Sequence, residues 1–224
     1  MAREIRTSTH IYAIEGPIGV GKSSVLHGLM QRGYSVFPEP VQEWESALKT
    51  FYSAQNKSDN ELNKDEVTQA AVDVQKVIVE SLAERHERVE DLMERFGRCK
   101  RPIFIERSLW SATSIFVGIN AEKYPSVQWQ NVREDIWEYC KIFENDLTWI
   151  ALHHDRFEDL VARTRARNGV DNNADEDYLR QVYDKSKEFE SECKFVINVT
   201  DKSIDQICEE IVWKISPISK NREF

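Results

Sequence analysis

The chain has 224 residues, 41% of them hydrophobic and 31% charged, which is typical of a folded globular protein. Its net charge of -9 at pH 7 argues against a nucleic acid backbone as the main partner, because such binding needs an excess of lysine and arginine. No apolar run is long enough to span a membrane, and four cysteines without a C-x-x-C pair are typical of reduced thiols in a cytoplasmic protein. We therefore expect one cytoplasmic domain over residues 1–224, with neither nucleic acid nor membrane as a partner.

Apolar runs alternate with stretches of helical periodicity along the whole chain. The runs that we predict to be buried strands cover residues 10–15, 34–38, 102–106, 147–153 and 194–199. Strands that alternate with helices are typical of an α/β fold, in which helices cover both faces of a parallel sheet. The longest helical pattern runs over residues 65–96 and is long enough to pack against a partner subunit as well as against its own sheet.

A glycine-rich segment connects the first predicted strand to a helix. Residues 16–23 read Gly-Pro-Ile-Gly-Val-Gly-Lys-Ser and match the P-loop pattern G-x-x-x-x-G-K-[ST]. Its glycines let main-chain N–H groups surround a phosphate, and the helix adds the positive end of its dipole. We expect Lys22 to reach the β- and γ-phosphates of ATP and the Ser23 hydroxyl to ligate Mg²⁺. The ATP-binding residues predicted in this segment are Gly16, Pro17, Ile18, Gly19, Val20, Gly21, Lys22, Ser23 and Ser24.

One short motif resembles the base-reading sequence of GTPases. Asn56-Lys-Ser-Asp59 matches N-K-x-D, but it lies in a polar stretch soon after the P-loop and does not follow a late strand. The D-x-x-G sequence of such proteins occurs nowhere in the chain. The sequence therefore argues against a GTP-dependent switch.

Charged residues follow the second and third predicted strands. Ligands of open parallel sheets bind beyond the carboxyl ends of the strands, so Glu39 is expected near the γ-phosphate, where it can accept a proton from an attacking hydroxyl. The third strand ends in Glu106-Arg107. Arg107 is placed to bridge the attacking oxygen and the transferred phosphoryl group. Glu106 is either a ligand of Mg²⁺ or a second candidate for the base.

Three arginines recur at alternate positions within residues 163–167. Arg163, Arg165 and Arg167 cannot all share one helix face, so they indicate either a solvated basic surface or a lid over the phosphates. A basic lid would neutralise charge that develops during phosphoryl transfer. We predict such a lid over about residues 163–175.

Together these segments resemble the deoxyribonucleoside kinase family, which includes the thymidine, deoxycytidine and deoxyguanosine kinases. The sequences EGPIGVGKSS, PEPVQEW, FIERS and RTRARN occur in the family's order and spacing, over roughly residues 11–211. The resemblance implies a three-layer P-loop kinase fold with a five-stranded parallel sheet flanked by helices and a small basic lid. It also implies a homodimer formed through long helices. The implied reaction moves the γ-phosphate of Mg-ATP to the 5′-hydroxyl of a deoxynucleoside, for the salvage of DNA precursors.

The resemblance also assigns roles to individual residues. Glu39 is similar to the family's base, and Glu106 with Arg107 to its pair around the metal and the 5′-oxygen. Trp44 and Tyr52 resemble aromatic residues of the substrate cleft, with Tyr52 also touching the sugar 3′-hydroxyl. The remaining implied contacts are Gln69 to the edge of the base, Phe116 stacked on the base, and Asp201, Lys202 and Ser203 in the adenine loop.

The spacing of the predicted helix adds detail to the acceptor site. Gln69, Val72 and Lys76 fall on one helix face, although Lys76 stands where an apolar residue would suit thymidine. Some relatives carry an aspartate where this chain has Ala112, and the smaller alanine leaves more room in the site. Together with Val72, this favours a pyrimidine acceptor such as thymidine or deoxycytidine. The acceptor residues predicted are Ile18, Glu39, Trp44, Tyr52, Gln69, Val72, Lys76, Arg107, Ala112, Phe116 and Asp171.

Asp171 enters that set because the chain departs from the family pattern after the lid arginines. Relatives carry a pair of glutamates there, and the second holds the 3′-hydroxyl. Gly169 and Val170 occupy the matching positions, so Asp171, one residue further, is the candidate substitute.

Two other functions are compatible with a P-loop. A monophosphate kinase of the thymidylate kinase type favours an Asp-Arg pair and a glycine after Glu-Pro, whereas this chain has Glu106-Arg107 and Val41. A phosphate-bearing acceptor would also need an extra arginine near Glu39, and the sequence has none there. A non-catalytic nucleotide-binding regulator is the alternative of another class, and the presence of Glu39 and Arg107 argues against it.

Overall fold

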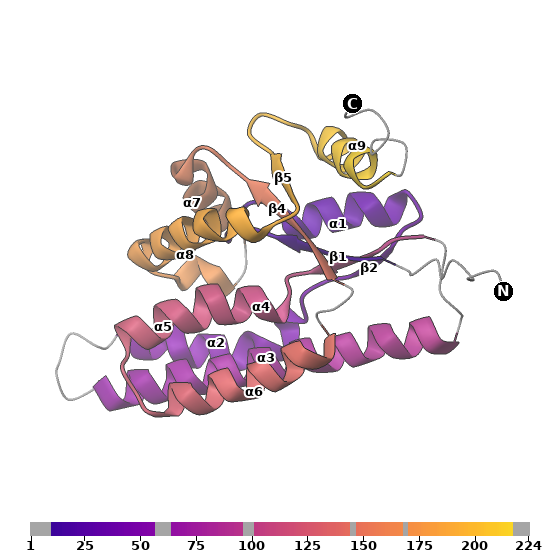
Figure 1. The fold of residues 1–224 in the computed structure, drawn as a ribbon. Coiled ribbons are helices and arrows are strands. Elements are labelled where there is room, and N and C mark those ends of the chain that lie inside the picture. The colour runs from indigo at the N-terminus through magenta and orange to yellow at the C-terminus, as the bar shows by residue number, and fades with distance from the viewer. Residues whose placement is uncertain (1–9, 57–63, 96–100, 144–146, 168–169, 217–224) are drawn as a thin grey trace.

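A computed structural model describes residues 10–56, 64–95, 101–143, 147–167 and 170–216 (Figure 1). Its centre is a sheet of five strands, all parallel, in the order β2-β3-β1-β4-β5. The strands are β1 (Ile11–Glu15), β2 (Ser35–Phe37), β3 (Ile103–Glu106), β4 (Leu147–His153) and β5 (Phe195–Asn198). This sheet confirms the predicted α/β fold, and each strand falls within the range expected from its apolar run.

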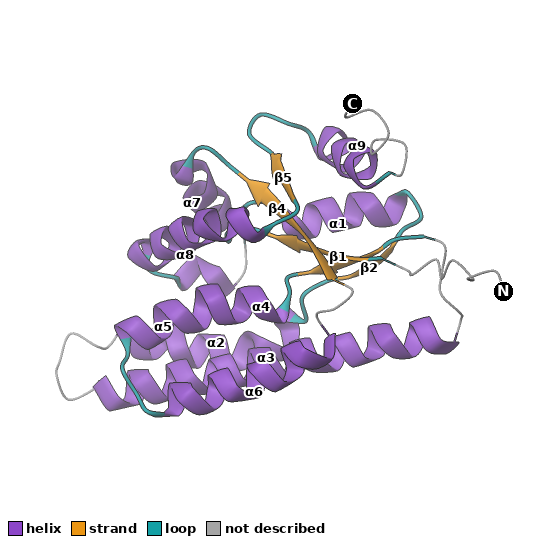
Figure 2. Ribbon diagram, in the orientation of Figure 1, coloured by secondary structure: helices purple, strands orange, loops and turns teal. Residues whose placement is uncertain are grey.

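Helices surround the sheet in two layers (Figure 2). On one side α1 (Lys22–Gln31) packs beside α9 (Ile204–Ile215), and on the other α2 (Val41–Asn56), α3 (Lys64–Arg95) and α6 (Gln128–Phe143) are grouped together. The other helical segments are α4 (Leu109–Ser111), the π-helix η2 (Ala112–Val117), α5 (Gly118–Lys123), α7 (Phe157–Ala166), the 3₁₀ helix η4 (Val170–Asn173), α8 (Glu176–Phe189) and the 3₁₀ helix η5 (Glu190–Glu192).

The central strand shows why the fold has three layers. Side chains of a strand alternate between the two faces of the sheet. Ile11 and Ala13 of β1 pack in a cluster with Val89 of α3, whereas Tyr12 and Ile14 belong to the larger core cluster that includes the buried residues of α1. Because both faces are apolar and covered, the strands read as continuous hydrophobic runs.

The long helix predicted over residues 65–96 is confirmed as α3, which has 32 residues. Its C-terminal part packs against the sheet through Val89, and the helix also contacts α2 and α6. In the part of the chain that the structure describes, no helix combines the length and hydropathy needed to cross a bilayer.

Candidate active site

The P-loop joins β1 to α1 with three glycines in backbone conformations that other residues rarely adopt. Gly16, Gly19 and Gly21 have φ angles of 137°, 85° and 104°. A Cβ atom on Gly16 would lie 2.7 Å from the carbonyl oxygen of Leu152, and one on Gly19 would lie 2.7 Å from that of Leu160. The glycines therefore provide both the turn and the close approach to β4 and α7. This strand, loop and helix confirm the structural context that the motif requires.

Lys22 begins α1 with its ammonium group folded back over the loop. Its Nζ donates to the carbonyl oxygens of Gly16 at 3.3 Å and Pro17 at 3.1 Å, and the residue is 5% exposed. Burial, reinforced by the charge of Arg107, lowers the pKa of Lys22 to about 8. The amine thus remains protonated near neutral pH, already stripped of water beside the phosphate-binding main chain.

Three strand ends bring the predicted catalytic residues together beside this loop. The Arg107 Nε lies 2.6 Å from a carboxylate oxygen of Glu39, and both side chains are nearly buried. The Ser23 hydroxyl donates to Glu106 at 2.9 Å, and the Glu39 main-chain N–H donates to the other Glu106 oxygen at 3.4 Å. The two base candidates therefore have different surroundings: Glu39 lines a cavity that Arg107 also lines, whereas Glu106 faces Ser23.

Ser23 and Glu106 form a donor set that suits Mg²⁺. A hydroxyl and a carboxylate are hard oxygen ligands, and Mg²⁺ is usually held by one or two protein groups together with substrate phosphates. No cluster of three or more His, Cys, Asp or Glu suited to a metal occurs among the described residues. The pair thus fits an ion that is shared with a nucleotide and does not form a complete metal site of its own.

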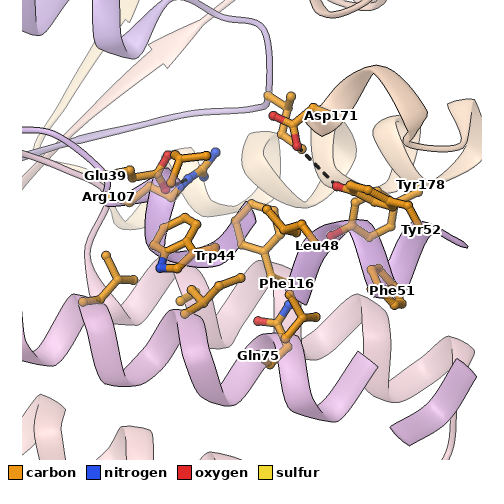
Figure 3. Close-up of a pocket in the computed structure, with 16 residues that line it drawn as sticks. Glu39, Trp44, Leu48, Phe51, Tyr52, Gln75, Arg107, Phe116, Asp171 and Tyr178 are labelled. Carbon is orange, nitrogen blue, oxygen red and sulfur yellow. Dashed lines mark hydrogen bonds and ion pairs between the residues drawn. The ribbon is translucent and has the colours of Figure 1, made fainter. Parts of the chain in front are cut away.

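A cavity opens beside Glu39 and Arg107 (Figure 3). Its lining is mainly apolar and aromatic with a few polar groups, which is typical of small-molecule sites. The aromatic side chains of Trp44 and Tyr52 from α2 form one wall, and Val74 and Ile78 are among the residues of α3 that form another. Eight predicted acceptor residues lie on this cavity: Ile18, Glu39, Trp44, Tyr52, Arg107, Ala112, Phe116 and Asp171.

Gln69, Val72 and Lys76 are not among the residues that line this cavity, and their contact with a nucleoside stays a prediction. Gln69 is exposed and its amide contacts Asp73 at 2.8 Å and Gln128 at 2.9 Å. Val72 is buried in the core away from the cavity, and Lys76 is half-buried outside it.

The cavity glutamine is Gln75, which is 2% exposed and whose side-chain oxygen has no hydrogen-bond partner among the described residues. At about 100° per residue, Gln69 lies roughly a third of a turn away from it. The buried stripe Val74, Ile78 and Leu82 is the signal that fixes this face, because Gln75 precedes Ile78 by three residues and Leu82 by seven.

At the far end of the cavity, two polar side chains from distant segments meet. The Tyr52 hydroxyl donates to the Asp171 carboxylate at 3.3 Å. Burial, followed by the negative charge of Glu39, raises the pKa of Asp171, and burial also raises the pKa of Tyr52 well above its usual value. Asp171 thus lies on the cavity beside Tyr52, and its role as a substitute for the family's second glutamate stays a prediction.

Neighbouring side chains contact the aromatic rings of Phe116 and Trp44. Phe116 lies in the π-helix η2, with the Arg107 guanidinium 4.6 Å from the centre of its ring. π-Helical turns frequently mark functional sites. The indole N–H of Trp44 donates to the Ser81 hydroxyl, which donates to the main chain of Ile78 at 3.0 Å. Both aromatic rings are therefore oriented by neighbours within the protein.

The lid arginines lie at the end of α7, and all three are exposed. Arg165 donates to the carbonyl oxygens of Asn172 and, at 2.7 Å, Ala174, which ties α7 to the segment that carries Asp171. None of Arg163, Arg165 and Arg167 lines the cavity. Their contact with ATP phosphates stays a prediction.

The residues predicted for the adenine loop follow β5. Asp201 pairs with Arg156 at 2.6 Å, and Lys202 pairs with Glu210 at the same distance. Ser203 caps α9 in a reciprocal capping box. Their side chains therefore shape the loop locally, and their contact with ATP also stays a prediction.

Sequence reasoning missed two buried charged residues behind the strand ends. Glu15, the last residue of β1, is fully buried and accepts a hydrogen bond from the Ser108 N–H at 2.7 Å, and burial raises its pKa. Arg85 of α3 is 5% exposed. Its position in the stripe of Ile78, Leu82 and Val89 was the available signal, because helical spacing places it on the buried face.

Comparisons with known proteins agree with this geometry. A family model described as deoxynucleoside kinase matches residues 12–218. The thymidine kinase of Ictalurid herpesvirus 1 (strain Auburn) is 29% identical over 117 residues, which cover 50% of this chain but only 43% of that protein.

Solved structures of a deoxyadenosine kinase from M. mycoides share the fold. The structure with the products dCMP and a flexible dCDP has a TM-score of 0.62 at 19% identity, and the structure with bound dATP has 0.66 at 16% identity. Each comparison covers 92% of this chain and 98% of the other. The family match extends from the first strand beyond the last helix, and the chain belongs to the deoxynucleoside kinase family.

Proposed function

We propose that the protein transfers the γ-phosphate of Mg-ATP to the 5′-hydroxyl of a deoxynucleoside. The observation that carries this proposal is the Glu39–Arg107 pair, which lies between the P-loop and the mainly apolar cavity. The pair contacts both the cavity and the P-loop. Glu39 and Arg107 line the cavity, and Arg107 also donates to the carbonyl oxygen of Gly16 in the loop at 3.2 Å. Membership of the family supports the same reaction.

The residues around the pair divide the work of phosphoryl transfer. Main-chain N–H groups of the loop and Lys22 would hold the ATP phosphates. Mg²⁺, held by Ser23 and Glu106, would neutralise charge on the phosphate oxygens. Glu39 would accept the 5′-hydroxyl proton as that oxygen bonds to the γ-phosphorus and the bond to the leaving ADP oxygen breaks. Arg107 would orient Glu39 and stabilise the charge on the transferred group.

The opposite end of the cavity suits a deoxyribose. Tyr52 and Asp171 together offer a hydroxyl and a carboxylate to the sugar 3′-hydroxyl. Asp171 comes from the segment that Arg165 ties to α7, so the sugar contact and the lid are parts of one connected structure. We therefore propose that Asp171 takes the role that a glutamate has in relatives.

The middle of the cavity suits a pyrimidine base. Gln75 presents an amide among the apolar side chains of Val74, Ile78 and Leu82, and an amide can both donate to and accept from the edge of a base. Ala112 leaves room opposite this wall. We propose thymidine as the first substrate to try and deoxycytidine as the second, and a preference for deoxyadenosine would overturn this part of the proposal.

The test is a panel assay with ATP labelled at the γ-phosphate. Thymidine, deoxycytidine, deoxyadenosine and deoxyguanosine are offered separately, next to dTMP and dCMP. The expected result is labelled dTMP or dCMP made from the nucleoside. Labelled diphosphate made from a monophosphate, with no labelled nucleoside product, would instead support the thymidylate kinase type, and ATP binding without turnover would support a regulator.

We also propose a cytoplasmic homodimer with contacts through its long helices. The supporting observation is a pair of exposed apolar side chains at α6: Trp137 within the helix is 56% exposed, and Val127 just before it is 90% exposed. Light scattering of the purified protein should give twice the mass of one chain, and a monomer at assay concentration would contradict this arrangement.

A further inference from the structure

Arg85 reaches from α3 to the ends of two strands. One guanidinium nitrogen donates to the carbonyl oxygen of Glu106 at 2.5 Å and, at 3.5 Å, to that of Pro38. The other terminal nitrogen donates to the carbonyl oxygen of Arg107 at 2.6 Å. One buried side chain therefore joins the main chain after β2 to the main chain after β3.

The buried guanidinium remains charged because carboxylates surround it. Burial lowers the pKa of Arg85 to about 10, while the charges of Glu39, Glu106 and Glu15 act in the opposite direction. A buried cation is tolerated when it is hydrogen-bonded and balanced by opposite charge. The two terminal nitrogens of Arg85 are hydrogen-bonded to carbonyls, and the charges of these three carboxylates favour the charged guanidinium.

The backbone held by Arg85 is strained at one residue. Arg107 has a φ of 60°, in the left-handed region that residues with a Cβ rarely adopt. Its N–H donates to the carbonyl oxygen of Ile14 at 3.1 Å, and its carbonyl accepts from Arg85. Hydrogen bonds on both sides of the residue therefore hold a conformation that would otherwise relax, and such strain often persists at functional sites.

This conformation decides where two reactive side chains point. Glu106 and Arg107 are consecutive, yet one contacts Ser23 at 2.9 Å and the other contacts Glu39 at 2.6 Å. Arg85 itself does not line the acceptor cavity. We infer that Arg85 is a positioning residue for phosphoryl transfer, which fixes the Glu106-Arg107 main chain so that both side chains reach their partners at once; the inference rests on the proposed kinase function.

Two substitutions test this role. Arg85→Met retains much of the length but removes every donor and the charge. Arg85→Lys retains the charge, but a single ammonium group cannot reproduce the planar fork that spans two carbonyls. The matched control is Arg88→Gln, one turn further along α3, where Arg88 is exposed and pairs with Glu84 at 3.2 Å. Thermal unfolding of every variant is measured beside kcat and the KM values for ATP and the nucleoside.

The expected result is a fall in kcat of roughly 10²-fold for Arg85→Met and an intermediate fall for Arg85→Lys, with both KM values changed less than about threefold. Arg88→Gln should match the parent. A kcat within about threefold of the parent in a folded Arg85→Met protein would overturn the inference, as would loss of folding in both variants, because Arg85 would then serve stability alone. If the parent and Arg88→Gln show no turnover with any nucleoside, the proposed function fails before the role of Arg85 is judged.

Discussion

The P-loop and the proposed acceptor cavity would hold their ligands by different means. The loop would use main-chain N–H groups within a single turn of the chain, and glycines at positive φ fix that turn. The cavity would use side chains that come from segments as distant as Trp44 and Asp171. A change in the loop should affect the reaction of every nucleoside acceptor equally, whereas a change in the cavity should affect some acceptors more than others. Changes in the two regions should therefore have different signatures.

The largest effect is expected where the two regions meet. Glu39→Gln removes the proposed base while retaining the shape of the side chain, so kcat should fall by about 10²–10⁴-fold for every acceptor. Steady-state kinetics with the best nucleoside measures this fall. The matched control is Glu43→Gln, an exposed glutamate at the start of α2, which should behave like the parent. Turnover within a few-fold of the parent for Glu39→Gln would remove Glu39 from the role of base and leave Glu106 as the candidate.

A smaller and more selective effect is expected inside the cavity. Gln75→Leu removes the buried amide, so the KM for the nucleoside should rise about tenfold, consistent with one lost hydrogen bond, while the KM for ATP stays unchanged. Gln69→Leu is the control, because Gln69 contacts only other exposed side chains of α3 and α6 in the described structure. Nucleoside kinetics of both variants decide between the two glutamines, and a raised KM in Gln69→Leu alone would show that the cavity has been assigned to the wrong face of α3.

On the donor side, two glycine substitutions separate strain from lack of space. Gly21→Ala meets no atom within 4 Å, so strain at its φ of 104° should destabilise folding by about 1–2 kcal/mol. Gly19→Ala has similar strain and also places a methyl group 2.7 Å from a carbonyl oxygen. It should therefore lower the free energy of unfolding by more than Gly21→Ala does. Denaturant unfolding compares the two. Equal losses would mean that the contact between the loop and α7 relaxes without cost.

The smallest effect concerns the pH dependence of stability. The raised pKa of Asp171 means that its protonated form favours folding, and this contribution is lost as pH rises through the folded-state pKa, above the ordinary value of 3.8. Asp171→Asn cannot ionise, so its unfolding temperature should fall less than that of the parent as the pH rises from the ordinary pKa value of 3.8 into the neutral range. Asp65→Asn at an exposed position is the control. An equal fall in Asp171→Asn and the parent would mean that the carboxyl is not desolvated in solution.

The same contrast explains which features the sequence could predict. The P-loop, Glu39 and the Glu106-Arg107 pair follow from local patterns and from strand ends, and the structure places them together. Gln69 and Gln75 occupy the same helix, and the apolar stripe of Val74, Ile78 and Leu82 was the sequence signal that favours Gln75 as the buried one. Helical spacing likewise places Arg85 on the buried face, but the sequence does not show its partners, which are carbonyl oxygens at the ends of β2 and β3.

A crystal structure with thymidine and a non-hydrolysable ATP analogue tests the central claim most directly. We predict phosphates in the P-loop, the nucleoside 5′-oxygen about 2.6–3.2 Å from the Glu39 carboxylate, and the edge of the base against Gln75. The 3′-hydroxyl should lie beside Tyr52 and Asp171. A nucleoside bound outside the cavity, or bound within it with the 5′-oxygen turned away from Glu39, would overturn the proposed transfer.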